Sequence, residues 1–159
     1  MTVLEVKNVT GGYTRKPVLH DLDFSIGKGE LVGLIGLNGA GKSTTIKHII
    51  GTMNASNGEI LLNGKTLKDD PALYRSSFSY IPETPVLYDE LTLNEHLELT
   101  AMAYNLDKDV FEARKTSLLK EFRMEKRLNW FPTHFSKGMR QKVMIVCAFL
   151  VSPSLYIID

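Results

Sequence analysis

The sequence lacks the patterns that mark secreted and membrane-spanning chains. It has a single cysteine among 159 residues, so an internal disulfide is excluded, and Cys147 is expected to be a small buried side chain. No apolar run approaches the roughly 20 residues of a membrane span. The first residues also lack the basic start and long apolar core of a signal peptide. A cytoplasmic location is therefore expected.

The sequence has little excess charge of either sign. Lys and Arg total 19 against 18 Asp and Glu, and this balance argues against a general nucleic-acid-binding surface. Residues 120–127 carry charges of both signs, and we interpret them as a solvated helix end. The four histidines have no metal-ligand spacing. The hydrophobic fraction is ordinary for a globular protein, and the chain is long enough to form one domain with a hydrophobic core.

One stretch matches a phosphate-binding pattern at every fixed position. Residues 36–43 read Gly-Leu-Asn-Gly-Ala-Gly-Lys-Ser, which fits G-x-x-x-x-G-K-[ST]. The apolar run Leu31–Ile35 before it predicts a buried strand, and Thr44–Ile50 after it predicts a helix with Ile46, Ile49 and Ile50 on one face. A strand, a glycine-rich turn and a helix are the context in which this pattern indicates binding of a nucleoside triphosphate.

The residue types of this loop explain its chemistry. Its glycines let backbone amides approach phosphate oxygens, and the positive end of the helix dipole reinforces the binding. Lys42 supplies a compact charge for the β- and γ-phosphates, and the Ser43 hydroxyl is suited to Mg²⁺. An ordinary glycine-rich turn with a surface lysine is the alternative. The expected phosphate-binding set is Gly36, Leu37, Asn38, Gly39, Ala40, Gly41, Lys42, Ser43 and Thr44.

Alternation of apolar and polar residues predicts strands on both sides of the loop. Leu4 and Val6 begin one strand, residues 18–26 form a second, and residues 58–62 form a third that ends in the hairpin signal Asn63-Gly64. Residues 79–81 predict a further strand, halted by Pro82, and residues 83–92 predict a loop. An apolar strand ending in Asp159 closes the chain.

Between these strands the apolar period becomes helical. Three helices are expected: one from Thr92, one from 107 to 123, and one from near Gly138. The predicted inward-facing residues are Leu93, Leu97, Ala101, Tyr104, Phe111, Leu118, Phe122, Val143, Met144, Cys147 and Leu150. The predicted fold class is α/β, a P-loop NTPase core with an antiparallel β subdomain and a helical block.

The order of these elements resembles the ATP-binding cassette, the nucleotide-binding subunit of ABC transporters, from Val3 to Asp159. Tyr13 matches the aromatic residue that stacks on adenine, and Glu83 occupies the position of the Q-loop glutamine. Residues 134–141 align with the signature motif, and residues 155–159 match the Walker B strand. The resemblance implies the ABC ATPase fold with ATP and Mg²⁺ as cofactors. Its parts are expected to be residues 1–91 (β subdomain and P-loop core), 92–151 (inserted helical subdomain) and 152–159 (Walker B strand).

The resemblance also implies roles for individual residues. Residues 80–92, 120–132 and 135–139 are similar to the Ecs-type bacterial subunits of the exporter-like branch. Catalytic roles are implied for Lys42, Glu83 and Asp159, Mg²⁺ ligation for Ser43, Glu83 and Asp159, and nucleotide contacts for Tyr13, Ser136 and Gly138.

Three residues depart from the family pattern. Glu83 puts a carboxylate where the family has an amide, so it would bind Mg²⁺ as a charged ligand with a different hydrogen-bond pattern. Lys137 and Met139 replace Gly and Gln of the usual signature. Ser136 and Gly138 remain, and the resemblance assigns their hydroxyl and amide to the γ-phosphate across a dimer.

Two catalytic residues of the family are absent from the sequence. The family has a glutamate directly after the Walker B aspartate and a histidine further on. The chain is therefore expected to be the N-terminal portion of a longer subunit, which would also supply the strand between the Walker A and Walker B strands. Alone, it is expected to be unable to turn over ATP. It is also expected to be poorly soluble, or else ordered only when the remainder of the subunit is present.

The resemblance implies an ATPase that powers a membrane transporter. The expected partners are a second copy, bound head-to-tail around ATP, and an integral membrane subunit; no nucleic acid is expected. The loop Glu83–Leu91 is expected to face the membrane subunit and to expose Val86, Leu87 and Tyr88. The location implied is cytoplasmic and peripheral on the inner face of the cell membrane. The alternatives are a soluble ABC-type regulatory ATPase without transport and a small P-loop kinase.

Overall fold

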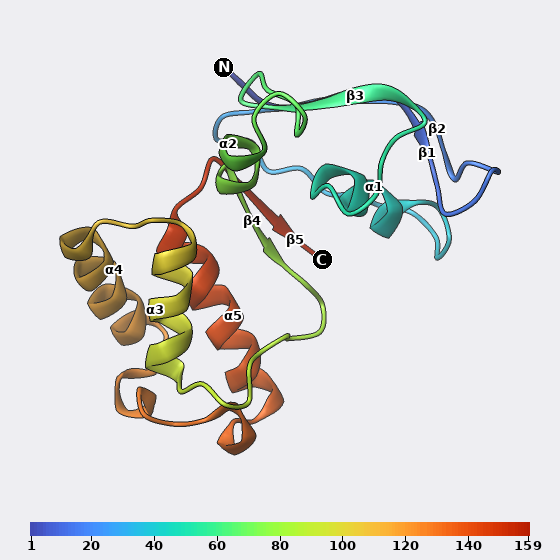
Figure 1. Ribbon diagram of the computed structural model, residues 1–159. Coiled ribbons are helices and arrows are strands. Elements are labelled where there is room, and N and C mark those ends of the chain that lie inside the picture. The colour runs from blue at the N-terminus through green and yellow to red at the C-terminus, as the bar shows by residue number, and fades with distance from the viewer. The chain divides into compact units, whose positions relative to one another are not determined.

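The computed structural model describes residues 1–159, which divide into two compact units. The first unit contains residues 1–78 together with Asp159, and the second contains residues 79–158 (Figure 1). No helix in either unit has the length and apolar character needed to cross a membrane. The three-part division expected from the sequence remains a prediction.

The first unit is built on an antiparallel sheet. Its strands are β1 (Thr2–Gly11), β2 (Leu19–Gly27) and β3 (Asn57–Leu62), in the order β2-β1-β3. Leu4 lies opposite Ile26 on one side and Leu62 on the other. Because side chains alternate along a strand, Leu4, Val6 and Leu62 are buried together while Lys7 stays accessible. The antiparallel β subdomain predicted from the sequence is therefore confirmed.

The predicted hairpin signal has the expected geometry. Asn63 and Gly64 have φ values of 50° and 76°, the left-handed pair that a tight two-residue turn requires. Leu62 donates to the Lys65 carbonyl at 2.9 Å, and Lys65 donates back at 3.1 Å. Glycine is also required at position 58, because a Cβ there would lie 2.3 Å from two backbone carbonyl oxygens of β1.

Two helices complete the first unit. α1 (Lys42–Ile49) follows the phosphate-binding pattern as predicted. α2 (Pro71–Ser76) was not predicted, although Asp70 caps it by accepting from the Leu73 amide at 3.0 Å. An Asp-Pro start is a known helix signal that could have identified it. The buried Tyr74 of α2 donates its hydroxyl to the Ile49 carbonyl at 2.7 Å, and burial raises the pKa of this phenol to about 12.

The buried strand predicted at Leu31–Ile35 is wrong. These residues join no sheet, and Leu31 and Ile35 are 101% and 98% exposed. An apolar run becomes a buried strand only where neighbouring strands pair with its backbone and cover its side chains. Neither the three-stranded sheet nor the pair β4-β5 supplies such a neighbour.

The second unit is a helical bundle with a two-stranded sheet. α3 (Leu93–Ala103) and α4 (Lys108–Glu121) both pack against α5 (Lys137–Val151), as Figure 1 shows. β4 (Phe78–Ile81), which belongs to this unit from Ser79 onward, pairs with β5 (Leu155–Ile158). Two 3₁₀ turns, η1 (Glu125–Arg127) and η2 (Pro132–His134), connect α4 to α5.

All three predicted helices and most of their inward-facing residues are confirmed. One buried cluster joins the helices and contains Leu93, Leu97, Ala101, Phe111, Leu119, Met124, Phe135, Val143, Val146 and Leu150. Leu118, Phe122 and Cys147 pack against it while partly buried. Met144 was predicted to be buried but is only partly so, and Val146 is buried instead. The face of α5 that meets α3 and α4 therefore includes Val146 in place of Met144.

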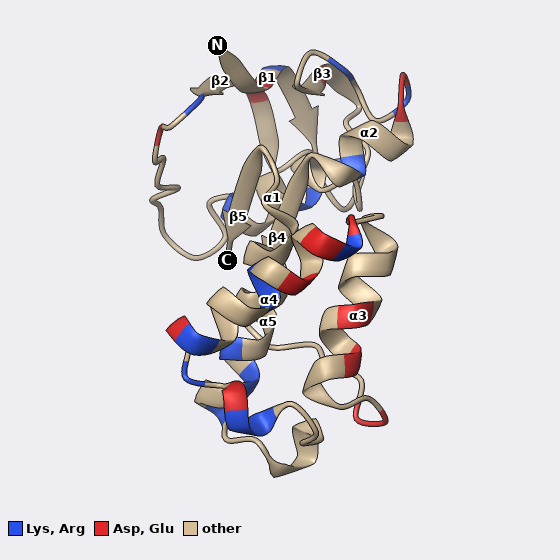
Figure 2. Ribbon diagram, turned by 90° about the vertical axis from the view of Figure 1, so that its left-hand side faces the viewer, with Lys and Arg blue, Asp and Glu red and all other residues tan.

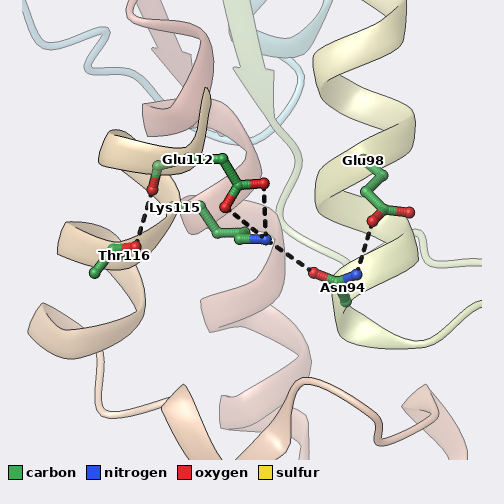
Figure 3. A network of polar contacts seen from close by, with 5 residues as sticks. All are labelled: Asn94, Glu98, Glu112, Lys115 and Thr116. Carbon is green, nitrogen blue, oxygen red and sulfur yellow. Dashed lines mark hydrogen bonds and ion pairs between the residues drawn. The ribbon is translucent and has the colours of Figure 1, made fainter. Parts of the chain in front are cut away.

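Hydrogen bonds and an ion pair join polar groups of α3 and α4. Lys115 of α4 reaches Asn94 of α3 at 3.4 Å and Glu112 at 3.3 Å, and Asn94 in turn donates to Glu98 (Figure 3). Thr92 caps α3 in a reciprocal pair with Glu95, each side chain bonding the other's backbone amide.

The start of α3 is also bonded to the segment that follows α4. Leu93 donates its amide to the Trp130 carbonyl at 2.9 Å, and Asn94 donates to the Leu128 carbonyl at the same distance. The first backbone donors of α3 are thereby satisfied from outside the helix.

Candidate functional site

The glycine-rich loop has the backbone conformation that its sequence predicts. Gly39 and Gly41 have φ values of 83° and 103°, which side-chain-bearing residues rarely adopt. A Cβ on Gly41 would also lie 2.8 Å from Leu19 Cδ2, so this glycine packs closely on the start of β2. Gly41 precedes α1 without any side-chain cap, and no acidic residue occupies the first turn. The positive end of the helix is therefore left to an external anion.

Lys42 folds back over the loop that precedes it. Its ammonium donates to the Gly36 carbonyl in a short contact and to the Leu37 carbonyl at 3.1 Å. A Cβ on Gly36 would point toward this ammonium at 4.0 Å. The loop thus brings one cation and the amides of a helix N-terminus to the same place, a donor set that fits the phosphates of a nucleotide. Ser43 follows in the first turn with its side chain exposed, and Thr44 is buried behind it.

Tyr13 is presented to solvent by a turn and fixed at its hydroxyl. The side chain is 61% exposed. Lys47 of α1 donates to the Tyr13 hydroxyl at 2.8 Å, and its ammonium lies 4.9 Å from the ring centroid. This hydrogen bond, assisted by Thr44, holds the pKa of Tyr13 below its ordinary value. Sequence reasoning missed Lys47, because no local pattern relates residues separated by 34 positions.

The acidic Q-loop residue is held through its backbone. Gln141 of α5 donates its side-chain amide to the Glu83 carbonyl at 3.2 Å, and the Glu83 carboxylate is exposed. The loop that follows exposes Val86 and Tyr88, which are 74% and 60% accessible. Leu87 does not share this exposure, since it packs against the helical core. Exposure of Leu87 was therefore wrongly predicted, because alternate residues of an extended loop face opposite sides.

The signature residues lie at the N-terminus of α5. Ser136 caps this helix, its hydroxyl oxygen accepting from the Met139 amide at 3.2 Å, which leaves the hydroxyl proton available as a donor. Gly138 faces open space, with no atom within 4 Å of where its Cβ would be. No acidic residue occupies the first turn. This is a second helix N-terminus suited to an anion.

The two units divide the predicted site residues between them. Tyr13, the loop and Asp159 belong to the first unit, whereas Glu83, Ser136 and Gly138 belong to the second. No group of three or more His, Cys, Asp or Glu side chains forms a metal cluster. The Mg²⁺ ligands Ser43, Glu83 and Asp159 remain predictions, as do the catalytic roles.

Comparison with known proteins identifies the family. The sequence profile described as ABC transporter matches residues 19–159, which include the glycine-rich loop and the signature residues. The chain belongs to the ABC transporter family. This ABC chain is 69% identical to the ABC-type transporter ATP-binding protein EcsA of Bacillus subtilis, over all of the chain and 64% of that protein. It is 34% identical to the SkfA peptide export ATP-binding protein SkfE of the same organism, over 66% of that protein.

A solved structure agrees with this assignment. The structure titled an ATP binding subunit of an ABC transporter matches 99% of the ABC chain with a TM-score of 0.96 and 64% identity. The predicted ABC ATPase fold and the resemblance to Ecs-type subunits are confirmed. The ABC chain spans 64% of the length of EcsA and 65% of the solved chain.

Proposed function

We propose that this ABC chain is the ATP-binding part of an ATPase subunit that powers a membrane transporter. The observation that carries the proposal is the glycine-rich loop with the Lys42 ammonium folded over it, directly before a helix N-terminus that has no acidic residue. The similarity to a transporter ATP-binding protein at 69% identity supports the transporter assignment.

Different residues of the first unit bind different parts of the nucleotide. Tyr13 stacks on the adenine ring, Lys42 and the loop amides bind the β- and γ-phosphates, and Ser43 and Asp159 ligate Mg²⁺. Mg²⁺ held by these two residues would supply positive charge beside the phosphate oxygens. Catalysis of this kind depends on positioning and electrostatics, with little covalent work for the protein.

A second copy of the chain completes the site. The N-terminus of α5 offers an exposed amide at Gly138, the Ser136 hydroxyl proton and the nearby cation Lys137. These groups suit the γ-phosphate of a nucleotide held by the loop of another copy, in a head-to-tail arrangement.

The loop from Glu83 to Leu91 is the proposed contact with the membrane subunit. Val86 and Tyr88 are exposed apolar side chains on it, and the Tyr88 amide donates to His96 Nε2 at 3.0 Å, which fixes the loop to α3. The subunit would then be cytoplasmic and peripheral on the membrane. Similarity to a protein named for peptide export favours an export role.

Nucleotide binding by a subunit that carries these residues at the full length of its relatives tests the first part of the proposal. Lys42→Ala should abolish binding of a fluorescent ATP analogue and of inorganic triphosphate, because both are bound through phosphates. The exposed Lys28 supplies a matched control, and Lys28→Ala should bind both ligands normally. If Lys42→Ala unfolds the chain by circular dichroism, the lysine is structural and the assignment fails.

Partner capture tests the transporter assignment. A subunit that carries these residues at the full length of its relatives should co-purify with an integral membrane protein, and its ATP hydrolysis should be lost in Lys42→Ala. Charge-reversing substitutions in the loop 83–91 should uncouple hydrolysis from transport. Hydrolysis without any membrane partner would favour a soluble regulatory ATPase.

A further inference from the structure

Charge is distributed unevenly along this nearly neutral chain. Residues 120–142 contain seven Lys and Arg and two Glu, although the whole sequence has a net charge of +1. Figure 2 shows these basic residues gathered at the end of α4, in the following turns and at the start of α5. They are Lys120, Arg123, Lys126, Arg127, Lys137, Arg140 and Lys142.

The two acidic residues of this segment do not neutralise it. Neither Glu121 nor Glu125 forms an ion pair, and the one ion pair made by these bases joins Arg140 to Asp89 at 3.7 Å. Mixed signs in the sequence thus coexist with an unpaired basic surface in the structure. Such a surface attracts anions through its summed field.

Three of the bases surround one hollow. It has a volume of about 280 Å³ and is lined by Arg123, Glu125, Lys126 and Arg127. Arg123 has a φ of 56°, so the chain reverses sharply at the end of α4 and brings these side chains together. Lys142 of α5 donates to the Phe122 carbonyl at 3.4 Å, which adds a fourth cation at the end of α4.

An aromatic hollow lies next along the same segment. It has a volume of about 330 Å³ and is lined by Asn129, Trp130, Phe131 and His134. Trp130 and Phe131 are 37% and 39% exposed. The Arg127 guanidinium lies 4.1 Å from the centre of the Trp130 ring, so one side-chain pair joins the basic hollow to the aromatic one.

We propose that the two hollows together bind an anionic phospholipid headgroup at a membrane surface. Arg123, Lys126 and Arg127 bind the lipid phosphate, and Glu125 accepts from a headgroup hydroxyl. Trp130 and Phe131 lie at the boundary between headgroups and acyl chains, where amphipathic and aromatic side chains are favoured. This site is separate from the nucleotide-binding residues and goes beyond the proposed ATPase function.

A lipid fits better than a soluble polyanion. Free phosphate would use the bases but would gain nothing from the two exposed aromatic side chains. A nucleic acid would cover a wide surface, and the rest of the chain carries net negative charge that would repel it. A membrane surface meets one face of the protein only, so the local basic surface is sufficient.

The single tryptophan of the chain gives a direct measurement. The purified protein is mixed with vesicles of phosphatidylcholine alone or of phosphatidylcholine with about 30 mol% phosphatidylglycerol, so that only the second kind has an anionic surface. Co-sedimentation and a blue shift of Trp130 emission are expected with the anionic vesicles only. Phospholipids brominated on the acyl chains should quench this emission.

Matched charge variants test the location. R123Q/K126Q/R127Q should weaken vesicle binding about 100-fold, since each basic residue near an anionic surface contributes about fivefold. The control K28Q/K65Q/K68Q removes the same charge from exposed lysines of the first unit and should bind as the parent does. Both variants should still bind ATP, so failure here is distinct from failure of the proposed function.

Other outcomes would overturn the proposal. These are no binding to anionic vesicles, binding without a change in Trp130 emission, or equal losses in the two triple variants. A single-stranded oligonucleotide that shifts Trp130 emission as much as the vesicles do, and displaces them, would indicate a nucleic-acid surface instead.

Discussion

Gly11, at the end of β1, is fitted against a buried histidine. His48 of α1 is 4% exposed, and its Nδ1 lies 2.7 Å from the Thr44 carbonyl. Because a carbonyl only accepts, Nδ1 carries the proton, and Nε2 presents a lone pair without a partner. A Cβ on Gly11 would lie 2.3 Å from this Nε2 and 3.1 Å from Cε1. Gly11→Ala therefore forces either the strand or the ring to move.

The ring is poorly able to yield. Moving it breaks the bond to Thr44, which is worth about 0.5–1.5 kcal/mol, and overpacking of this kind typically costs about 1–3 kcal/mol. We expect Gly11→Ala to destabilise the chain by about 2–4 kcal/mol. The backbone of Gly11 is not left-handed, so the substitution has no conformational penalty of its own.

Removing the ring should reverse the sign of this effect. In a His48→Ala background the space is vacant, and Gly11→Ala should stabilise by about 0.4–1 kcal/mol through reduced entropy of the unfolded chain. Urea unfolding followed by far-ultraviolet circular dichroism measures the free energy of unfolding of the parent, the two single variants and the double variant. Gly33→Ala is the matched control, because nothing lies within 4 Å of that Cβ position. Equal destabilisation by Gly11→Ala in both backgrounds would refute the reasoning.

Three further predictions concern other contacts. Lys47→Met should weaken ATP binding about fivefold and leave inorganic triphosphate binding unchanged, because losing one hydrogen bond to Tyr13 is worth about 1 kcal/mol; equal losses for both ligands would contradict it. Lys115→Met should lower the melting temperature by about 2–4 °C by removing the link between α3 and α4 in Figure 3. Burial raises the pKa of Cys147 to about 11 from 9.0, so its alkylation at pH 8 should be about 100-fold slower folded than unfolded. Since the unfolded thiol ionises first, stability should fall as the pH rises from about 9 to 11, and a Cys147→Ala variant should lack that slope.

Most of the fold could be predicted because its local signals agree with its tertiary contacts. The stripe of Leu93, Leu97 and Ala101 faces a real helical core, and Asn63-Gly64 forms the turn its residues favour. The prediction of a strand at Leu31–Ile35 was wrong because an apolar run indicates only that its side chains favour burial. It does not show whether partner strands are present to pair with its backbone.

The candidate site was predictable to the extent that its chemistry is contiguous in sequence. The loop from Gly36 to Ser43 contains its own glycines, cation and hydroxyl, so its pattern was sufficient. The hydrogen bonds from Lys47 to Tyr13 and from Gln141 to Glu83 could not be predicted in this way, because each joins residues far apart in the sequence. The basic hollow was missed for a related reason, since charges that alternate along a chain need not pair in space.

The backbone bonds between α3 and the segment after α4 have a mechanical consequence. Helix ends usually fray, yet the first amides of α3 are bound to the carbonyls of Trp130 and Leu128 and to the Thr92 cap. Release of the connecting segment would leave the Leu93 and Asn94 amides without their carbonyl partners, and unwinding of the start of α3 would move those amides away from the segment. The end of the Glu83–Leu91 loop and the approach to the signature helix are thus linked through the start of α3, and disorder in either one would weaken the anchoring of the other.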